Sequence, residues 1–122
     1  MKKEKNNFNG QELILNLYNC NQKIITSKEK IANYINKICK EIKVKKYGPT
    51  RIERFGGDSH WGYGYSFFQF IEESSICGHL LENNDTAFIN IFSCKPFSNP
   101  KAINFTKKYF QAKKVKKIVL YK

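Results

Sequence analysis

Residues that could carry out chemistry gather near the middle of the sequence. Residues 72–79 read Glu-Glu-Ser-Ser-Ile-Cys-Gly-His, and Cys94 follows fifteen residues after the histidine. A serine hydroxyl or a cysteine thiol can attack a carbonyl carbon, and a histidine within reach can move the proton. Taken singly, Ser74 in a turn, His79 beside a strand and Cys94 after a strand are more often structural residues. Any chemistry therefore depends on the elements that hold them.

Five stretches have the apolar and aromatic pattern of β-strands. They are residues 12–18, 65–71, 75–81, 86–92 and 115–121. The middle three follow one another closely, which predicts a meander. Residues 44–47 could start a further strand before Gly48 and Pro49 interrupt the pattern, and residues 55–64 read as an irregular aromatic loop.

Two helices are predicted between these strands. Thr26 and Glu29 have the spacing of a capping box, and isoleucines then recur at helical intervals for about four turns. Those isoleucines are Ile31, Ile35, Ile38 and Ile42. A second helix is expected to begin at Asn99 or Pro100.

Two helices cannot cover both faces of a sheet of five or six strands. The sequence therefore predicts a single domain over residues 1–122, of the α+β class. Its architecture would be a two-layer α/β sandwich, an antiparallel sheet with two helices on one face. The other face of the sheet needs a partner, and a homodimer with the two sheets face to face would bury it.

The chain carries a formal charge of +12, from 22 Lys plus Arg against 10 Asp plus Glu. Such an excess raises the question of a polyanionic partner. Because the lysines spread over both ends of the chain, we interpret them as a solvated surface, and nucleic acid is not an expected partner.

Four cysteines, at 20, 39, 77 and 94, lack the paired spacing of zinc ligands, so no metal site is predicted. No apolar run approaches the roughly 20 residues that span a bilayer, and no hydrophobic signal segment precedes the cysteines. We therefore expect a cytoplasmic protein with reduced thiols and no membrane partner.

The spacing of the polar residues resembles the small bacterial and archaeal form of S-adenosylmethionine decarboxylase. That family carries a Glu-Ser cleavage pair, a histidine five residues beyond the serine and a Phe-(Thr/Ser)-Cys that ends twenty residues beyond it. Here Glu73-Ser74, His79 and Cys94 fall at those intervals, and Ser66 matches a family serine eight residues before the cleavage serine. The likeness covers nearly the whole chain.

The resemblance implies that the protein cleaves itself. The Ser74 hydroxyl would attack the carbonyl of Glu73 and turn the peptide into an ester, a step that strain in a tight turn would favour. Ser66 would support this step, and His79 would assist removal of the serine α-proton. Elimination would then leave residues 1–73 and 74–122, the second beginning with a pyruvoyl group made from Ser74.

The pyruvoyl group is the cofactor that the resemblance implies. Its ketone forms a Schiff base with a substrate amine and accepts electrons as carbon dioxide leaves. The resemblance gives Cys94 the task of protonating the carbon that lost the carboxyl group. The implied reaction is decarboxylation of S-adenosylmethionine for spermidine synthesis.

Departures from the family pattern concern the substrate. After the histidine the family continues Thr-Trp-Pro-Glu, whereas this chain has Leu81 at the tryptophan position and Asn83 at the glutamate position. Glu82 could replace the carboxylate, and His60 or Trp61 could supply a surface that stacks on the adenine. A decarboxylase of ornithine or arginine with the same mechanism is therefore an alternative.

Three other functions stay open at this point. The chain could be an uncleaved homologue without catalytic activity. It could be a basic nucleic-acid-binding module that stacks bases on Trp61, Tyr63 and Tyr65. A cysteine hydrolase built on Cys94 and His79 ranks last, because no third residue that would orient the histidine is identifiable.

Overall fold

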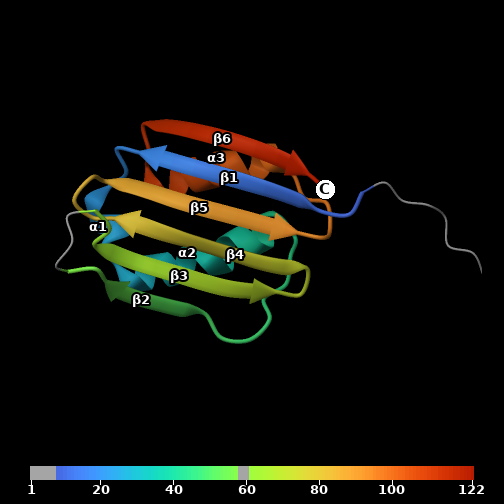
Figure 1. The fold of residues 1–122 in the computed structure, drawn as a ribbon, viewed down its shortest axis with the longest axis horizontal. Coiled ribbons are helices and arrows are strands. Elements are labelled where there is room, and N and C mark those ends of the chain that lie inside the picture. Colours follow the sequence, from blue (N-terminus) through green and yellow to red (C-terminus); the bar gives the residue numbers. More distant parts are fainter. Residues whose placement is uncertain (1–7, 58–60) are drawn as a thin grey trace, which may run out of the picture.

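The computed structural model describes residues 8–57 and 61–122. They form a six-stranded antiparallel sheet and three helices (Figure 1). The elements in chain order are β1 (Gln11–Tyr18), α1 (Gln22–Ile25), α2 (Lys28–Glu41), β2 (Arg51–Phe55), β3 (Gly64–Ile71), β4 (Ser74–Leu81), β5 (Thr86–Ser93), α3 (Asn99–Phe110) and β6 (Lys114–Tyr121). The strands lie side by side in the order β2-β3-β4-β5-β1-β6.

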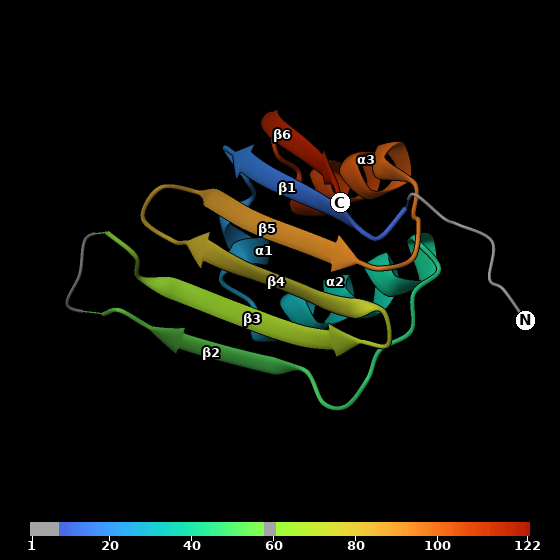
Figure 2. The same cartoon turned by 45° about the vertical axis from the view of Figure 1, so that its right-hand side comes forward.

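All three helices lie on one side of the sheet (Figures 1 and 2). Every second residue of β1 points toward them and is fully buried, as in Leu13, Leu15 and Leu17. The isoleucine stripe of α2 meets this layer, because Ile31, Ile35 and Ile38 are also fully buried and Ile42 is 4% exposed. The predicted α+β sandwich is thus confirmed, with the short helix α1 as an addition that sequence patterns did not indicate.

The start of α2 differs from the predicted capping box. Ser27 is the N-cap, and its hydroxyl accepts a hydrogen bond from the backbone N–H of Lys30. Thr26 ends α1 instead, where its hydroxyl donates to the Gln22 carbonyl. Thr26 is therefore the C-cap of the additional short helix, and the N-cap of α2 is the next residue, Ser27.

The strand suggested at residues 44–47 was wrong. This stretch makes one bridge, between Lys46 and Ile71, and the edge strand β2 lies further on at Arg51–Phe55. Buried Gln69 explains why residues 44–47 do not continue as a strand, because its side-chain amide donates to the carbonyls of Tyr47 and Gly48. Those backbone groups are therefore bound by a side chain rather than by a strand ladder.

The face of the sheet opposite the helices, here called the open face, exposes large apolar side chains. They are Phe68 (37% exposed), Phe70 (56%), Phe88 (38%), Ile118 (56%) and Leu120 (45%). An apolar surface that extends over several strands is typical of a contact with another protein surface. None of the helices in the described ranges has the length and apolarity needed to cross a membrane.

Candidate active site

The predicted cleavage bond lies where a tight turn meets a strand. Glu72 and Glu73 form a two-residue turn between β3 and β4, and Ser74 is the first residue of β4, paired with Ile71 across the turn. The carbonyl of Glu73 accepts a hydrogen bond of 2.9 Å from the backbone N–H of Cys94. The structure therefore brings Glu73, Ser74 and Cys94 together, although twenty residues separate Ser74 from Cys94 in the chain.

A second polar cluster lies further along β4. Ser66 on β3 pairs with His79 on β4, and the Ser66 hydroxyl is hydrogen-bonded to Nδ1 of His79. The other ring nitrogen, Nε2, lies 2.7 Å from the carbonyl oxygen of Gly62. Because a carbonyl oxygen only accepts, the proton of the neutral ring belongs on Nε2. Nδ1 then faces the Ser66 hydroxyl as an acceptor, which is the state of a general base.

The two clusters do not meet within one chain. Ser74 and His79 are five residues apart on the same strand. At the usual rise of a strand they are separated by about 17 Å, well beyond hydrogen-bonding reach. The predicted processing residues are therefore divided into a Glu73–Ser74–Cys94 group and a Ser66–His79 group.

Two glycines allow β3 and β4 to lie close together around the second cluster. A Cβ on Gly64 would lie 1.8 Å from the carbonyl oxygen of Leu80. A Cβ on Gly78 would lie 2.5 Å from the ring of Phe67, its partner across the ladder. The bare backbone at Gly78 lets that aromatic ring cover it, so the strand pair that holds Ser66 and His79 depends on both glycines.

The four thiols differ in environment. Cys20 and Cys39 are buried, and burial raises the pKa of each thiol to about 11. Cys77 is half-buried on the open face, and burial also raises its pKa. Cys94 is exposed at the end of β5. The thiol beside the predicted cleavage bond is thus the accessible one.

A shallow cavity of about 540 Å³ opens on the open face beside Ser66. Phe55, Phe68 and Phe70 contribute its aromatic walls. The Phe55 ring also lies 6.0 Å from the His79 ring, measured between centroids. This volume is in the range of small-molecule sites, and the walls suit a flat ring or a diffuse positive charge.

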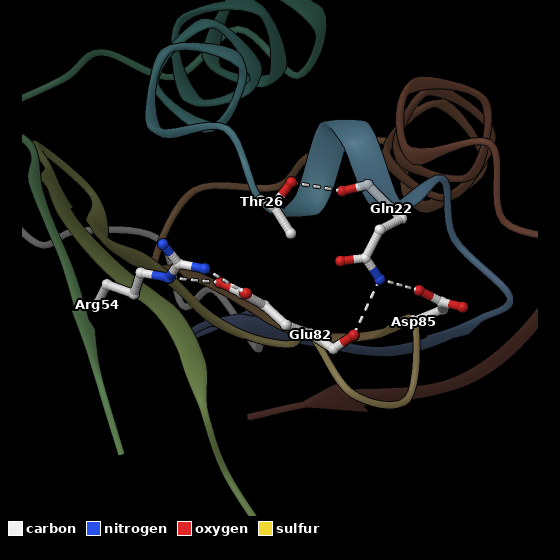
Figure 3. A network of polar contacts seen from close by, with 5 residues as sticks. All are labelled: Gln22, Thr26, Arg54, Glu82 and Asp85. Carbon is white, nitrogen blue, oxygen red and sulfur yellow. Dashed lines mark hydrogen bonds and ion pairs between the residues drawn. The ribbon is translucent and has the colours of Figure 1, made fainter. Parts of the chain in front are cut away.

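The residues predicted to bind substrate have different surroundings. Both carboxylate oxygens of Glu82 bind the Arg54 guanidinium, at 2.8 and 2.5 Å, and the Glu82 side chain is 8% exposed (Figure 3). A contact between this carboxylate and substrate would require it to leave Arg54. Trp61 is 90% exposed, and His60 lies outside the described residues.

Arg54 was missed by sequence reasoning. Its guanidinium binds Glu82 and also lies over the rings of Tyr63 and Tyr65, at 5.0 and 5.4 Å from their centroids. The available signal was that arginine occurs only at 51 and 54 in a lysine-rich chain. Arginine is favoured over lysine where one planar cation must bind both oxygens of a carboxylate and stack on an aromatic ring.

The described chain is thus an α+β sandwich protein whose reactive side chains cluster at two points along one central strand. The family model for S-adenosylmethionine decarboxylase matches residues 11–121. The protein therefore belongs to the S-adenosylmethionine decarboxylase family, a family of decarboxylases, which confirms the resemblance seen in the sequence.

Solved structures agree with this fold. The chain is similar to the crystal structure of the adenosylmethionine decarboxylase from Aquifex aeolicus VF5, with a TM-score of 0.77. The match covers 93% of this chain and 89% of that chain at 16% sequence identity, a level at which the likeness establishes the fold. A comparison with curated protein sequences returns no match.

Proposed function

We propose that the protein is a self-processing, pyruvoyl-dependent decarboxylase that makes its cofactor from Ser74. The hydrogen bond from the Cys94 N–H to the Glu73 carbonyl carries this proposal. Attack of the Ser74 hydroxyl on that carbonyl places negative charge on its oxygen. A fixed N–H at 2.9 Å stabilises such an oxyanion, which is the requirement for the first step of self-cleavage.

The same contact accounts for the second role of Cys94. A pyruvoyl group at position 74 supplies an electrophilic ketone that binds a substrate amine and withdraws electrons as carbon dioxide leaves. Cys94 is held beside position 74 by its backbone, and its side chain is exposed. Its thiol is thus available to hold the proton that replaces the carboxyl group.

Ser66 and His79 complete the site from a second copy of the chain. In a homodimer with the open faces in contact, a twofold axis that runs between the two sheets, over the middle of β4 and perpendicular to it, places the His79 end of one strand over the Ser74 end of the other. Nδ1 of His79 is then able to take the α-proton of Ser74 in the partner. The exposed apolar side chains of the open face supply the contact surface.

We propose S-adenosylmethionine as the substrate, for polyamine synthesis. The cavity beside Ser66 has aromatic walls, which suit an adenine ring and a sulfonium charge. Ornithine carries a compact ammonium charge that needs an unpaired carboxylate. Among the described residues near His79, Glu82 is bound to Arg54 and Glu53 is bound to Arg51. Beside Ser74, Oε1 of Glu73 is buried without a hydrogen-bond partner in the described part of the chain, and this oxygen favours the second candidate, a basic amino acid.

Leu81 and Asn83 favour the basic amino acids as a second candidate, because they replace the family's stacking and carboxylate residues. Release of labelled carbon dioxide from S-adenosylmethionine, ornithine and arginine, compared at equal concentration, decides between them. Turnover of an amino acid alone would show that these two positions set the substrate.

Intact mass spectrometry tests the cofactor. We expect the purified protein to give two fragments, residues 1–73 and 74–122, the second with the mass of an N-terminal pyruvoyl group. Ser74→Ala should give one uncleaved chain, while Ser75→Ala, at the adjacent serine, should still be cleaved. A parent protein that stays whole after long incubation contradicts the proposal.

A further inference from the structure

The loop between β2 and β3 presents one backbone group to the proposed base. The carbonyl of Gly62 lies 2.7 Å from Nε2 of His79 and so decides which ring nitrogen carries the proton. A loop carbonyl performs this task only if the loop is held in place. The contacts around the next residue, Tyr63, show what holds it.

Tyr63 is held from two sides. Its carbonyl accepts a hydrogen bond of 3.1 Å from the backbone N–H of Glu82, and its ring lies 5.0 Å from the Arg54 guanidinium. Arg54 in turn binds both oxygens of Glu82. Glu82 thus holds Tyr63 twice: its backbone N–H binds the Tyr63 carbonyl, and its carboxylate binds the Arg54 guanidinium that lies over the Tyr63 ring.

Glu82 is itself anchored to the helical layer. The side-chain amide of Gln22, in α1, donates to the Glu82 carbonyl at 2.9 Å and also binds Asp85 (Figure 3). The Glu82 side chain is 8% exposed, whereas the Arg54 side chain is 41% exposed, so the carboxylate is buried and only the guanidinium reaches solvent. Arg54 therefore acts on the loop from a fixed point.

We propose that Arg54 is a positioning residue for His79. Through Glu82 and Tyr63 it fixes the Gly62 carbonyl, which keeps the ring proton on Nε2. Nδ1 is then left as a hydrogen-bond acceptor for the Ser66 hydroxyl and, in the proposed dimer, as the acceptor of the α-proton of Ser74 in the partner. This role rests on the proposed function of His79 in processing. Lysine cannot replace Arg54, because it offers neither the planar fork nor the flat stacking surface.

Nuclear magnetic resonance of the histidine ring tests the proposal without any need for cleavage. The experiment uses the full chain with Ser74→Ala and nitrogen-15 labelled histidine. His79 and His60 are the two histidines, so His79→Gln assigns the signals. In the parent we expect the Nε2–H proton of His79 to be observed near pH 8, because its hydrogen bond to Gly62 slows exchange with water.

Arg54→Met and Arg54→Lys should both lose this proton signal to solvent exchange, while the far-ultraviolet circular dichroism stays that of the parent. Arg51→Met is the matched control, since it removes the other arginine and its ion pair with Glu53 on the same strand. The control should keep the signal. In the Ser74 background, we expect Arg54→Met to slow cleavage at least about tenfold.

Glu82→Gln decides the question if Arg54→Met does not fold, because it keeps the shape of the side chain and removes the charge that binds Arg54. Persistence of the Nε2–H signal in the folded Arg54 and Glu82 variants overturns the proposal. If the Ser74→Ala chain shows the signal but the chain with Ser74 intact is never cleaved, the proposed function is contradicted and the role of Arg54 stands.

Discussion

Cys94 contributes to the proposed chemistry through two separate groups. Its backbone N–H binds the Glu73 carbonyl, and its exposed thiol is the proposed proton donor. A substitution that keeps the backbone separates these roles. We expect Cys94→Ala to be cleaved at a rate within about threefold of the parent, and to decarboxylate substrate at least ~100-fold more slowly. Mass spectrometry and carbon dioxide release measure the two steps.

Cys77→Ala is the control for this prediction, because it removes a half-buried thiol from the same strand as Ser74. We expect both steps to stay near the parent rates. Loss of cleavage in Cys94→Ala, with cleavage retained in Cys77→Ala, would show that the thiol and not the N–H serves the first step.

The buried thiols predict how stability depends on pH. Burial raises the pKa of Cys20 and Cys39 from 9.0 to about 11. Between these values the unfolded chain loses the proton while the folded chain keeps it, so the contribution to stability is full below pH 9 and falls as pH rises toward 11. The full fall is about 2–3 kcal/mol for each thiol.

Urea denaturation at pH 8 and pH 10.5 measures this effect, with every protein carrying Ser74→Ala so that one uncleaved chain unfolds reversibly. Cys39→Ala should lose less stability between the two values than the parent does, because one of the two titrating groups is gone. Cys94→Ser, at the exposed thiol, is the control and should follow the parent. An equal fall in all three proteins would contradict the assignment to buried thiols.

At the scale of the elements, the pair of β3 and β4 depends on Gly78. A side chain at this position would overlap the Phe67 ring and the Phe88 carbonyl. We expect Gly78→Ala to lower the free energy of unfolding by roughly 2–4 kcal/mol, measured by urea denaturation of the uncleaved Ser74→Ala chain. Adding Phe67→Leu should recover part of this loss, because the smaller side chain makes room.

Gly57→Ala serves as the comparison, since among the described residues a Cβ there meets the Tyr63 ring alone, at an ordinary 3.6 Å. Its effect should stay within about 0.5 kcal/mol. A Gly78→Ala protein as stable as Gly57→Ala would show that the sheet adjusts and that the glycine is not required.

The elements also show which features sequence patterns could predict. The isoleucine stripe of α2 was readable because helical burial repeats at a fixed interval. Strand β2 was not readable, because only Ile52 of its five residues is buried. An edge strand with mostly exposed residues has no period to detect. Val44 misled the prediction, since it is buried beside the end of α2 rather than in a ladder.

The candidate site was also predictable only in part, because spacing along the chain does not give contacts between strands. The family spacing proposed Ser74, His79 and Cys94 as site residues, but spacing does not give the register of β4 against β5. That register sets Ser74 opposite Ser93, and Cys94 lies next to Glu73. The role of Arg54 depends on contacts between three separate segments, and no local pattern reveals those.

At the scale of the whole molecule, the separation of the two clusters predicts complementation between chains. Ser66→Ala lacks the serine that accompanies His79, and Ser74→Ala lacks the cleavable serine, so neither should be cleaved alone. In a mixed dimer the intact Ser66 of one chain serves the intact Ser74 of the other. We expect up to half of the Ser66→Ala chains to be cleaved after mixing at a one-to-one ratio, as measured by intact mass.

Absence of cleavage after subunit exchange would show that Ser66 and His79 of one chain do not act on Ser74 of the other. Phe70→Glu is the companion variant, because it puts a charge on the exposed apolar part of the open face. In analytical ultracentrifugation it should shift the protein to monomer, and the mixed chains that carry it should no longer be cleaved.

The strand order determines how the two fragments of a cleaved chain would stay together. The proposed cleavage puts β1, β2 and β3 in one piece and β4, β5 and β6 in the other, while β1 lies between β5 and β6 in the sheet. The pieces can part only by opening three ladders, and finding each other again becomes a second-order event that dilution slows. The uncleaved chain folds as one body, whereas the mature pair has no such route. On the proposed function, a cleaved protein that is fully unfolded therefore does not regain its structure by the route that the uncleaved chain used.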